Sequence, residues 1–380
     1  MTMIRVTILA LLPLATVLAL PVQVTKAEQP VVDLACGPVR GSVAPTDSLG
    51  DVYEFYQIPY GLPPVGSRRW THSQLLEPTN GPCWDETFNA TALPSPPVKC
   101  VQYYKSWEDP PLTGQEDCLV LSVRTPSLDP AKRLPVLVWI HGGSLMTGWS
   151  DEPGYAPDAE FTADMGVVTV TINYRLDLMG FFSSPEIWND PARKGNYGNF
   201  GIGDGVTALR WVQANIEKFG GDPDSVTILG ESSGGTVVMG LLVAEQADGL
   251  FHNAIAQSAP VKWVTTYEDA YEGRKSFVSD VGCTQETETE RRECLKSMDV
   301  EILSKHVDIN RGWGFYDFPL GAGPSGESMD YNVIEPTVVR VAPADLGNVQ
   351  QRRTPVNVYI SNTAQETGYN ALYYSTNQVN

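Results

Sequence analysis

Two continuous apolar runs constrain the fold of this chain more than any other feature of its sequence. Residues 136–140 are all apolar, and residues 167–172 consist only of Val, Thr and Ile. Neither run alternates between apolar and charged residues, so both predict strands that are buried on two faces, as the central strands of a parallel sheet are.

The following sequence alternates between helical and strand patterns. Apolar residues three or four positions apart within 209–219 predict an amphipathic helix that ends at Gly220. A strand pattern at 226–229 and a second helical face at 237–242 come next. This rhythm predicts an α/β fold with a central, mostly parallel sheet flanked by helices.

Composition and charge limit the kind of protein. Of the 380 residues, 42% are hydrophobic and 19% are charged, which suits a large core and not a disordered chain. The net charge of −19 argues against nucleic acid and anionic membranes as partners, whereas a small neutral or cationic ligand fits it. Because no repeat or linker interrupts residues 31–380, we expect them to form one domain.

The first residues have the features of a targeting signal. Arg5 precedes an apolar stretch that extends to Leu20, and Ala27 offers a small residue for cleavage. We therefore expect residues 1–27 to be a signal peptide and the protein to be secreted, with an uncleaved signal anchor as the alternative. No later segment is apolar enough for a transmembrane helix.

Secretion would permit disulfide bonds and glycosylation. The six cysteines are an even number without a Cys-x-x-Cys pair that would suggest zinc, so we expect disulfides and no metal site. The sequence alone leaves their pairing open. The sequon that begins at Asn89 predicts an N-linked glycan there if this asparagine is on the surface.

The strongest chemical motif lies where the 226–229 strand meets the next helix. Gly230, Ser232 and Gly234 form a Gly-x-Ser-x-Gly pattern there. Small residues on either side let strand and helix approach closely, which exposes the serine hydroxyl on a sharp turn. An ordinary Gly-Ser turn is the alternative, but this context favours a nucleophile elbow. The N–H of Ser233 would then point toward a developing oxyanion.

A second set of donors follows the 136–140 strand. His141, Gly142, Gly143 and Ser144 occupy the loop that, with such an elbow, supplies further N–H groups to an oxyanion hole. The two glycines allow close approach of the backbone to a substrate. A plain glycine turn is the alternative, but the order of the two motifs favours the functional interpretation.

Several blocks of the chain resemble the carboxylesterase type B family, which includes cholinesterases, carboxylesterases and the non-catalytic neuroligins. The resemblance implies an α/β-hydrolase fold and ester hydrolysis through an acyl-enzyme. It implies Ser232 as nucleophile and the N–H groups of Gly143, Ser144 and Ser233 as oxyanion hole. Ser144 replaces the usual third glycine, which would narrow the acyl pocket slightly. The similar blocks, in family order, are residues 58–60 with 63–66, 116–121, 173–176, 219–223 and 230–235.

The resemblance assigns the acid of the catalytic triad to a loop that follows a later strand. Residues 356–360 predict that strand, and Glu366 takes the acid position. Its loop lacks the Asp that the family prefers before the Glu, so a solvated surface glutamate is the alternative. Glu231, beside Ser232, is expected to contribute charge near the site and not to belong to the triad.

The general base is the missing member of the triad. A serine nucleophile needs an imidazole within reach, and the family places it after the acid. Of four histidines none follows Glu366, and the chain ends at Asn380. We therefore expect a fold that is incomplete at its C-terminus, a fragment of a longer esterase that lacks the catalytic His and is inactive as given. The alternative is a repurposed histidine, His306 or else His252.

Two functions of different classes follow from these patterns. The first is a serine carboxylic-ester hydrolase that acts on a small-molecule ester and needs no cofactor. The second is a non-catalytic, neuroligin-like adhesion or binding module. Ser232 favours the hydrolase, because non-catalytic relatives typically lose the nucleophile. Trp107 lies near the place of the choline-binding tryptophan of cholinesterases, but we interpret it as an ordinary loop residue. The ester and the oligomeric state stay open.

The resemblance also implies which side chains pair. It joins two cysteine pairs and leaves a third, so the expected disulfides are Cys100–Cys118, Cys283–Cys294 and Cys36–Cys83. The expected ion pairs, which would tie loops to the sheet, are Arg69–Glu116 and Arg175–Asp204.

Overall fold

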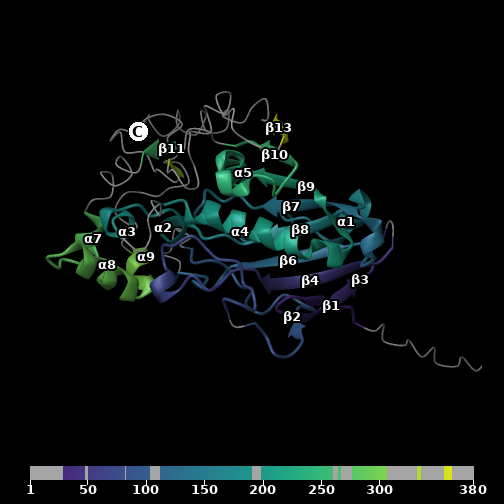
Figure 1. Ribbon diagram of the computed structural model, residues 1–380, viewed down its shortest axis with the longest axis horizontal. Helices are drawn as coiled ribbons and strands as arrows, with labels where there is room; N and C mark the ends of the chain where they lie inside the picture. The colour runs from purple at the N-terminus through teal and green to yellow at the C-terminus, as the bar shows by residue number, and fades with distance from the viewer. Residues whose placement is uncertain are drawn as a thin grey trace, which may run out of the picture.

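An eight-stranded sheet forms the centre of the molecule in the computed structural model (Figure 1). The structure describes residues 29–47, 50–81, 83–102, 112–190, 198–259, 264–266, 276–305, 332–334 and 355–361. From one edge to the other, the strands are β13 (Asn357–Ser361), β10 (Asn253–Gln257), β9 (Gly221–Glu231), β7 (Leu134–Ile140), β8 (Val168–Ile172), β6 (Val120–Thr125), β4 (Val52–Pro59) and β3 (Ser42–Ala44).

The sheet is parallel in its larger part and antiparallel at one side. The strands from β13 through β8 run parallel, and β6, β4 and β3 continue the sheet in antiparallel pairs. Val138 on β7 lies in register with Val170 on β8 and Ile228 on β9. All residues of β6 and β8 are buried, which explains why their sequences do not alternate. The three predicted central strands are thus confirmed.

Helices connect the parallel strands. α1 (Ala159–Met165) lies between β7 and β8, α4 (Phe200–Asn215) precedes β9, and α5 (Ser233–Val243) joins β9 to β10. β8 lies on one side of β7, whereas the next strand, β9, lies on the other side, so the order in which strands are added across the sheet reverses after β8. Because parallel crossovers are right-handed, α1 covers one face of the sheet, and α4 and α5 pack together on the other. The short helices α2 (Asp177–Phe181) and α3 (Pro185–Trp188) precede α4.

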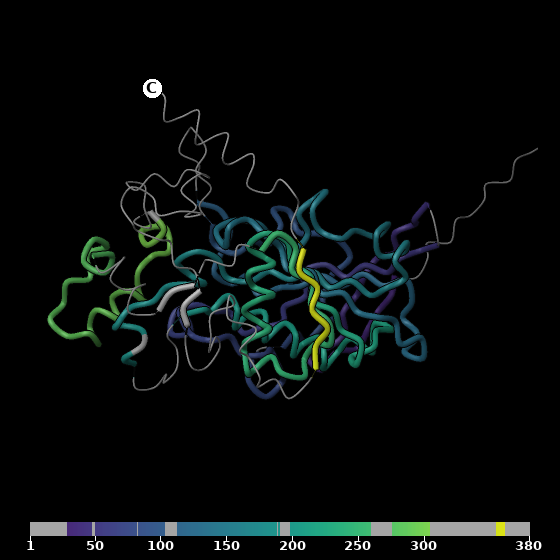
Figure 2. Tube along the Cα trace, turned by 90° about the horizontal axis from the view of Figure 1, so that it is seen from above, coloured from purple at the N-terminus to yellow at the C-terminus, as the bar shows by residue number. Residues whose placement is uncertain are grey.

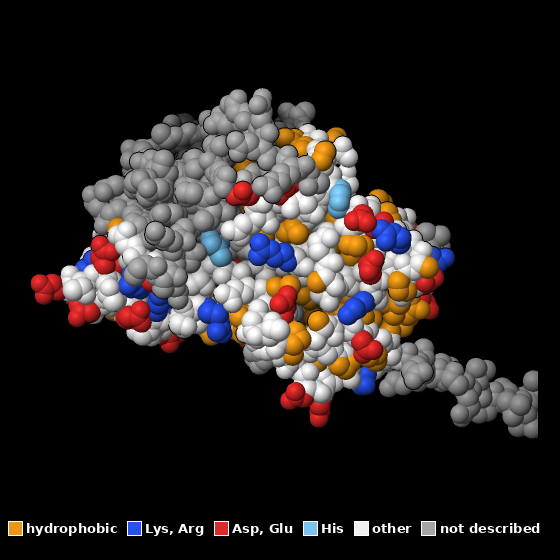
Figure 3. All heavy atoms as spheres, in the orientation of Figure 1, with side chains coloured by type: hydrophobic (Ala, Val, Ile, Leu, Met, Phe, Trp, Pro, Cys, Tyr) orange, Lys and Arg blue, Asp and Glu red, His pale blue; other side chains and the backbone are white. Residues whose placement is uncertain are grey.

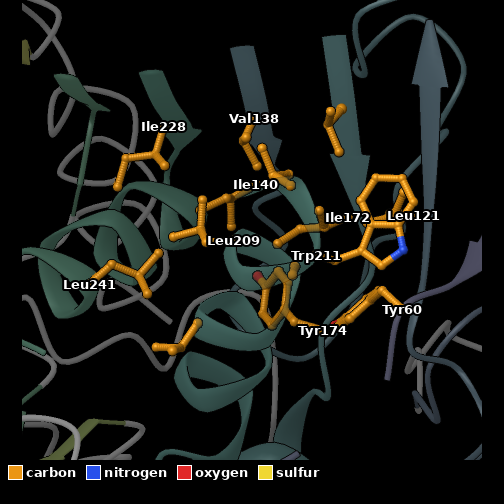
Figure 4. Packing of buried hydrophobic residues seen from close by; sticks show 14 of the residues in the cluster. Tyr60, Leu121, Val138, Ile140, Ile172, Tyr174, Leu209, Trp211, Ile228 and Leu241 are labelled. Atoms are coloured by element: carbon orange, nitrogen blue, oxygen red, sulfur yellow. The ribbon is translucent and has the colours of Figure 1, made fainter. Parts of the chain in front are cut away.

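The helix predicted over 209–219 is longer and more buried than its pattern suggests. It begins at Phe200, and a 3-10 turn, η4 (Ile216–Phe219), follows its end at Asn215. Gly220 then stops it with a left-handed φ of 76°, as predicted. Figure 4 shows Leu209 and Trp211 of this helix packed toward Ile140 and Ile172, so its apolar face completes the main core.

Smaller elements surround this core. β1 (Val31–Leu34), β2 (Gly37–Arg40) and β5 (Phe88–Asn89) form a three-stranded sheet, and β11 (Val264–Thr266) pairs with β12 (Asn332–Ile334). The helices α7 (Phe277–Asp280), α8 (Glu288–Ser297) and α9 (Val300–Lys305) lie together at one end of the molecule (Figure 2). The described residues also form the 3-10 turns η1 (Gly66–Arg68), η2 (Pro130–Lys132) and η5 (Glu245–Ala247).

Three disulfides and two buried ion pairs join segments that are distant in sequence. The disulfides are Cys36–Cys83, Cys100–Cys118 and Cys283–Cys294, the pairs that the sequence analysis expects. The two expected ion pairs are also present: Arg69 to Glu116 at 2.6 Å and Arg175 to Asp204 at 2.7 Å.

The surface carries both signs of charge. On the face shown in Figure 3, acidic and basic side chains are interspersed with small apolar areas. Among the described residues there is no helix with the length and hydrophobicity that crossing a membrane requires. Within the same residues, no group of His, Cys, Asp and Glu side chains is arranged to hold a metal ion.

Candidate active site

Ser232 occupies a sharp turn between β9 and α5. Its φ of 54° and ψ of −126° are strained for a residue with a side chain, and such strain concentrates at functional sites. The backbone on both sides is well held, because Ser232 N–H donates to Gln257 O at 2.9 Å and Thr236 N–H donates to Ser232 O at 3.2 Å. The predicted strand–turn–helix context of the elbow is therefore present.

Packing requires a glycine at position 234 of the motif. A Cβ atom at Gly234 would lie 2.1 Å from Ile140 O and 2.7 Å from His141 O, at the end of β7. Any side chain would push α5 away from the sheet. Gly234 thus brings the first turn of α5 onto the end of β7, which places Ser232 beside the loop that follows this strand.

That loop, residues 141–148, is called the β7 loop here. Gly143, Ser144 and Leu145 all have positive φ, at 97°, 66° and 57°. Gly143 O accepts hydrogen bonds from the N–H groups of Met146 and Thr147, both at 3.0 Å. The N–H of Leu145 donates to Ser233 Oγ at 3.0 Å, so the loop is fastened to the start of α5.

The β7 loop approaches the candidate nucleophile closely. A Cβ atom at Gly142 would lie 3.2 Å from Ser232 Cβ and 2.8 Å from Glu231 O. Nowhere in the described part of the chain does an acceptor bind the N–H of Gly143, Ser144 or Ser233. Ser233 begins α5, where backbone donors have no partner within the helix. The arrangement offers backbone donors beside Ser232.

A tyrosine that sequence reasoning missed joins the β7 loop to the elbow. The hydroxyl of Tyr155 accepts from Gly142 N–H at 3.1 Å and donates to Glu231 Oε2 at 2.6 Å. Burial, and then the hydrogen bond to Glu231, raise the pKa of Tyr155, so it keeps its proton. No local motif marks Tyr155, since it lies 76 residues from Glu231 in sequence.

His141, the first residue of the β7 loop, packs inside the protein. Its side chain is buried, stacks on Tyr174 with ring centroids 4.5 Å apart, and has Nδ1 2.8 Å from Gly142 O. Tyr174 in turn donates its hydroxyl hydrogen to His141 O at 2.7 Å. Burial lowers the pKa of His141 to about 4, so the ring is neutral near pH 7. His141 therefore has a packing role in the loop.

The three triad candidates, Glu366, His306 and His252, have different outcomes. Glu366 and His306 lie outside the described residues, as does Trp107. His252 is described, and its Nδ1 accepts the N–H of Val226 at 3.2 Å. Val226 is six residues before Ser232 on β9, roughly 20 Å along a strand. That distance rules out His252 as the base for Ser232.

The predicted glycosylation site is on the surface. Asn89 is exposed at the end of β5, and its Oδ1 accepts the Thr91 hydroxyl hydrogen at 2.9 Å. The sequon therefore satisfies the condition of surface exposure set by the sequence analysis.

Comparison with known proteins agrees with this geometry. The family described as "Carboxylesterase family" matches residues 28–380. The chain is 37% identical to a fatty acyl-CoA hydrolase precursor, medium chain, of Anas platyrhynchos, over 76% of this chain and 51% of that protein. It is 34% identical to neuroligin-2 of Mus musculus, over 80% of this chain and 40% of that protein.

A solved structure has the same fold. The carboxylesterase EST55 of Geobacillus stearothermophilus superimposes with a TM-score of 0.73 at 30% identity, covering 92% of this chain and 66% of that one. The expected α/β-hydrolase fold is thereby confirmed. The chain spans about half the length of the curated relatives it matches.

Proposed function

The chain belongs to the carboxylesterase family, and from this premise we propose that it carries the nucleophile and oxyanion hole of a serine carboxylic-ester hydrolase. The observation that carries the proposal is the strained turn at Ser232 beside a loop with unpaired backbone donors. Relatives named as carboxylesterases and as an acyl-CoA hydrolase support a small-molecule ester or thioester substrate. No cofactor is needed for this chemistry.

In this proposal the reaction has two halves. Ser232 Oγ attacks the carbonyl carbon of the ester, the alcohol leaves, and an acyl-enzyme forms that water then hydrolyses. The N–H groups of Gly143, Ser144 and Ser233 hold the carbonyl oxygen while it carries negative charge. Because these donors are fixed by the fold before the substrate arrives, little reorganisation accompanies the reaction.

The remaining triad members stay proposals. Glu366, which follows β13 in the sequence, is the proposed acid. The base must be an imidazole in reach of Ser232, and neither the packed His141 nor the distant His252 meets this condition. The half-length match to relatives supports a fragment of a longer esterase, with the imidazole on a segment outside this chain.

Covalent labelling of Ser232 tests this function. A fluorophosphonate probe should modify Ser232 slowly in the 380-residue chain, which lacks the proposed base, and rapidly in a longer product from the same transcript. Peptide mass spectrometry identifies the labelled serine, and Ser232→Ala should abolish the label. Ser297→Ala, at an exposed serine on α8, is the matched control and should keep it. Ester turnover by the 380-residue chain should stay at the residual level of triad knock-outs, about 10³ to 10⁴-fold above the uncatalysed reaction.

A neuroligin-like binding module is the second candidate, favoured by the match to neuroligin-2. The same experiment separates the two. If the folded wild-type protein shows no label above the Ser232→Ala variant, while a longer product from the same transcript also stays unlabelled, the hydrolase proposal fails and the adhesion role gains support.

We also propose that the chain enters the secretory pathway. Three disulfides are typical of proteins that fold in an oxidising compartment, and one similar protein is named a precursor. Residues 1–27 would be removed as a signal peptide, and Asn89 would carry a glycan. N-terminal sequencing of the protein from the medium of expressing eukaryotic cells, and the loss of a glycosidase-sensitive mass shift in Asn89→Gln, test both statements.

A further inference from the structure

The side chain of Gln102 pairs with the far end of the β7 loop. Its Oε1 accepts from Gly148 N–H at 3.1 Å, and its Nε2 donates to Gly148 O at 3.0 Å. The same Nε2 donates to Cys100 O at 3.1 Å. Gln102 is only 7% exposed, so these bonds are screened from water and their loss would leave backbone groups unpaired.

Gly148 connects the Gln102 contact to the residues at the start of the β7 loop. Its φ is 105°, and a Cβ atom there would lie 2.5 Å from His141 Nδ1 and 2.9 Å from Gly142 O. Gly148 therefore packs directly against the two residues that precede the proposed donor Gly143. The position of Gly148 limits the positions that His141 and Gly142 can take, because protein interiors are close-packed.

The segment that carries Gln102 is itself rigidly held. Cys100 is bonded to Cys118, and the N–H and C=O of Gln102 pair with the C=O and N–H of Thr113 at 2.9 and 3.0 Å. Gln102 thus lies at the neck of the loop that the Cys100–Cys118 disulfide closes. Its amide links this disulfide-bonded segment to the β7 loop.

We propose that Gln102 is a positioning residue for the oxyanion hole. Among the contacts that hold the β7 loop, Tyr155 binds Gly142, Ser233 binds Leu145, and Gln102 binds Gly148. The first two contacts hold residues in the first part of the loop, and Gln102 holds its last residue, Gly148. Without it, Gly148 can move away from His141, and the N–H groups of Gly143 and Ser144 lose their fixed direction. The assignment as an oxyanion hole rests on the proposed function, whereas the clamp itself does not.

The chain offers a matched control for the test. Gln57 is 4% exposed and makes the same bidentate pair with a backbone residue, since its Oε1 accepts from Val98 N–H at 2.9 Å and its Nε2 donates to Val98 O at 3.0 Å. Gln102→Met and Gln57→Met each remove such a bidentate pair at a buried site, and Gln102→Met also removes the bond to Cys100 O. Only the first removes bonds to the β7 loop.

Amide hydrogen exchange of the full 380-residue chain is the first measurement. Gln102→Met should raise exchange in residues 142–148 about tenfold over the wild type, while Gln57→Met should leave that segment at the wild-type rate. Gln102→Asn, which is too short to reach both Gly148 groups, should act like the methionine variant and serves if the latter does not fold. Equal protection of 142–148 in all variants would overturn the proposal.

The rate of fluorophosphonate labelling at Ser232 is the second measurement. Gln102→Met should slow labelling about tenfold relative to Gln57→Met at equal melting temperature, because small displacements of a positioned group cost one to two powers of ten in rate. Raised exchange with unchanged labelling would overturn the positioning role. If neither the wild type nor a longer product from the same transcript is labelled at Ser232, the proposed function fails, and the exchange result still decides whether the clamp exists.

Discussion

The hydroxyl of Tyr155 lies 2.6 Å from Glu231 Oε2 and also accepts the N–H of Gly142, so one side chain spans the elbow and the β7 loop. Tyr155→Phe removes both bonds and leaves the buried Gly142 N–H unpaired. We expect the free energy of unfolding to fall by about 1–3 kcal/mol and labelling of Ser232 to slow by roughly tenfold. Tyr53→Phe on β4 is the control for removing a phenol hydroxyl; equal effects of the two changes would contradict the prediction.

Ser144 occupies a left-handed conformation that costs a residue with a Cβ atom about 1–2 kcal/mol. Ser144→Gly removes that cost, whereas Ser144→Ala keeps it. We expect the glycine variant to be more stable than the alanine variant by about 1 kcal/mol in urea denaturation. Since both variants delete the hydroxyl, the difference between their free energies of unfolding reports the cost of the backbone conformation alone. An alanine variant as stable as the glycine variant would show that φ at this position is not strained.

Arg69 holds three segments together. It binds Glu116 through two nitrogens, both at 2.6 Å, and its Nη1 donates to Leu295 O at 2.9 Å and to Met298 O at 2.8 Å near the end of α8. Arg69→Met leaves the largely buried Glu116 carboxylate without its partner and removes a donor from the carbonyls of Leu295 and Met298. The expected loss is about 3–5 kcal/mol in the free energy of unfolding.

Two further variants serve as comparisons for the stability loss expected in Arg69→Met. Adding Glu116→Gln to Arg69→Met should recover part of the loss, because no unpaired charge then stays buried. Arg133→Met, which breaks a half-exposed cluster with Asp222 and Asp224, should cost less than about 1 kcal/mol. Equal costs at the two arginines would mean that burial does not govern these pairs.

The buried His141 makes stability depend on pH. Its pKa is lowered from 6.5 to about 4 in the folded protein, so the unfolded chain binds more protons between these values. Stability that His141 contributes is therefore present above pH 6.5 and is lost as the pH falls toward 4. Between pH 7 and 5 the loss should be roughly 2 kcal/mol relative to His141→Gln. Urea denaturation of both proteins at each pH measures this, and parallel curves would contradict it.

Local sequence patterns were sufficient for the sheet and the elbow. Val168–Ile172 are all buried, and so are residues 136–140 except the half-buried Leu137, so these apolar runs carry a clear signal. The Ser232 turn is equally local, because its glycines, strand and helix are contiguous. Gly220 ended its helix as predicted for the same reason.

The residues that support the site could not be found in this way. Tyr155 meets Glu231 across 76 residues, and Gln102 meets Gly148 across 46, with no period or motif to connect them. Such contacts follow from how β7 and β9 pair side by side and from where Gln102, near the Cys100–Cys118 disulfide, lies against the β7 loop. Arg69 and Glu116 were found only because family resemblance supplies the pairing that spacing does not.

The pairing of β7 with β9 and of β9 with β10 also bears on the order in which the molecule is made. Every described residue that shapes the Ser232 turn, from Gln102 to the Gln257 carbonyl that holds its N–H, lies before residue 258. Domains begin to fold from the N-terminus while the ribosome is still adding residues. The Ser232 turn can therefore assemble on the nascent chain before β13 leaves the ribosome, so its geometry is set by the part of the protein that is translated first.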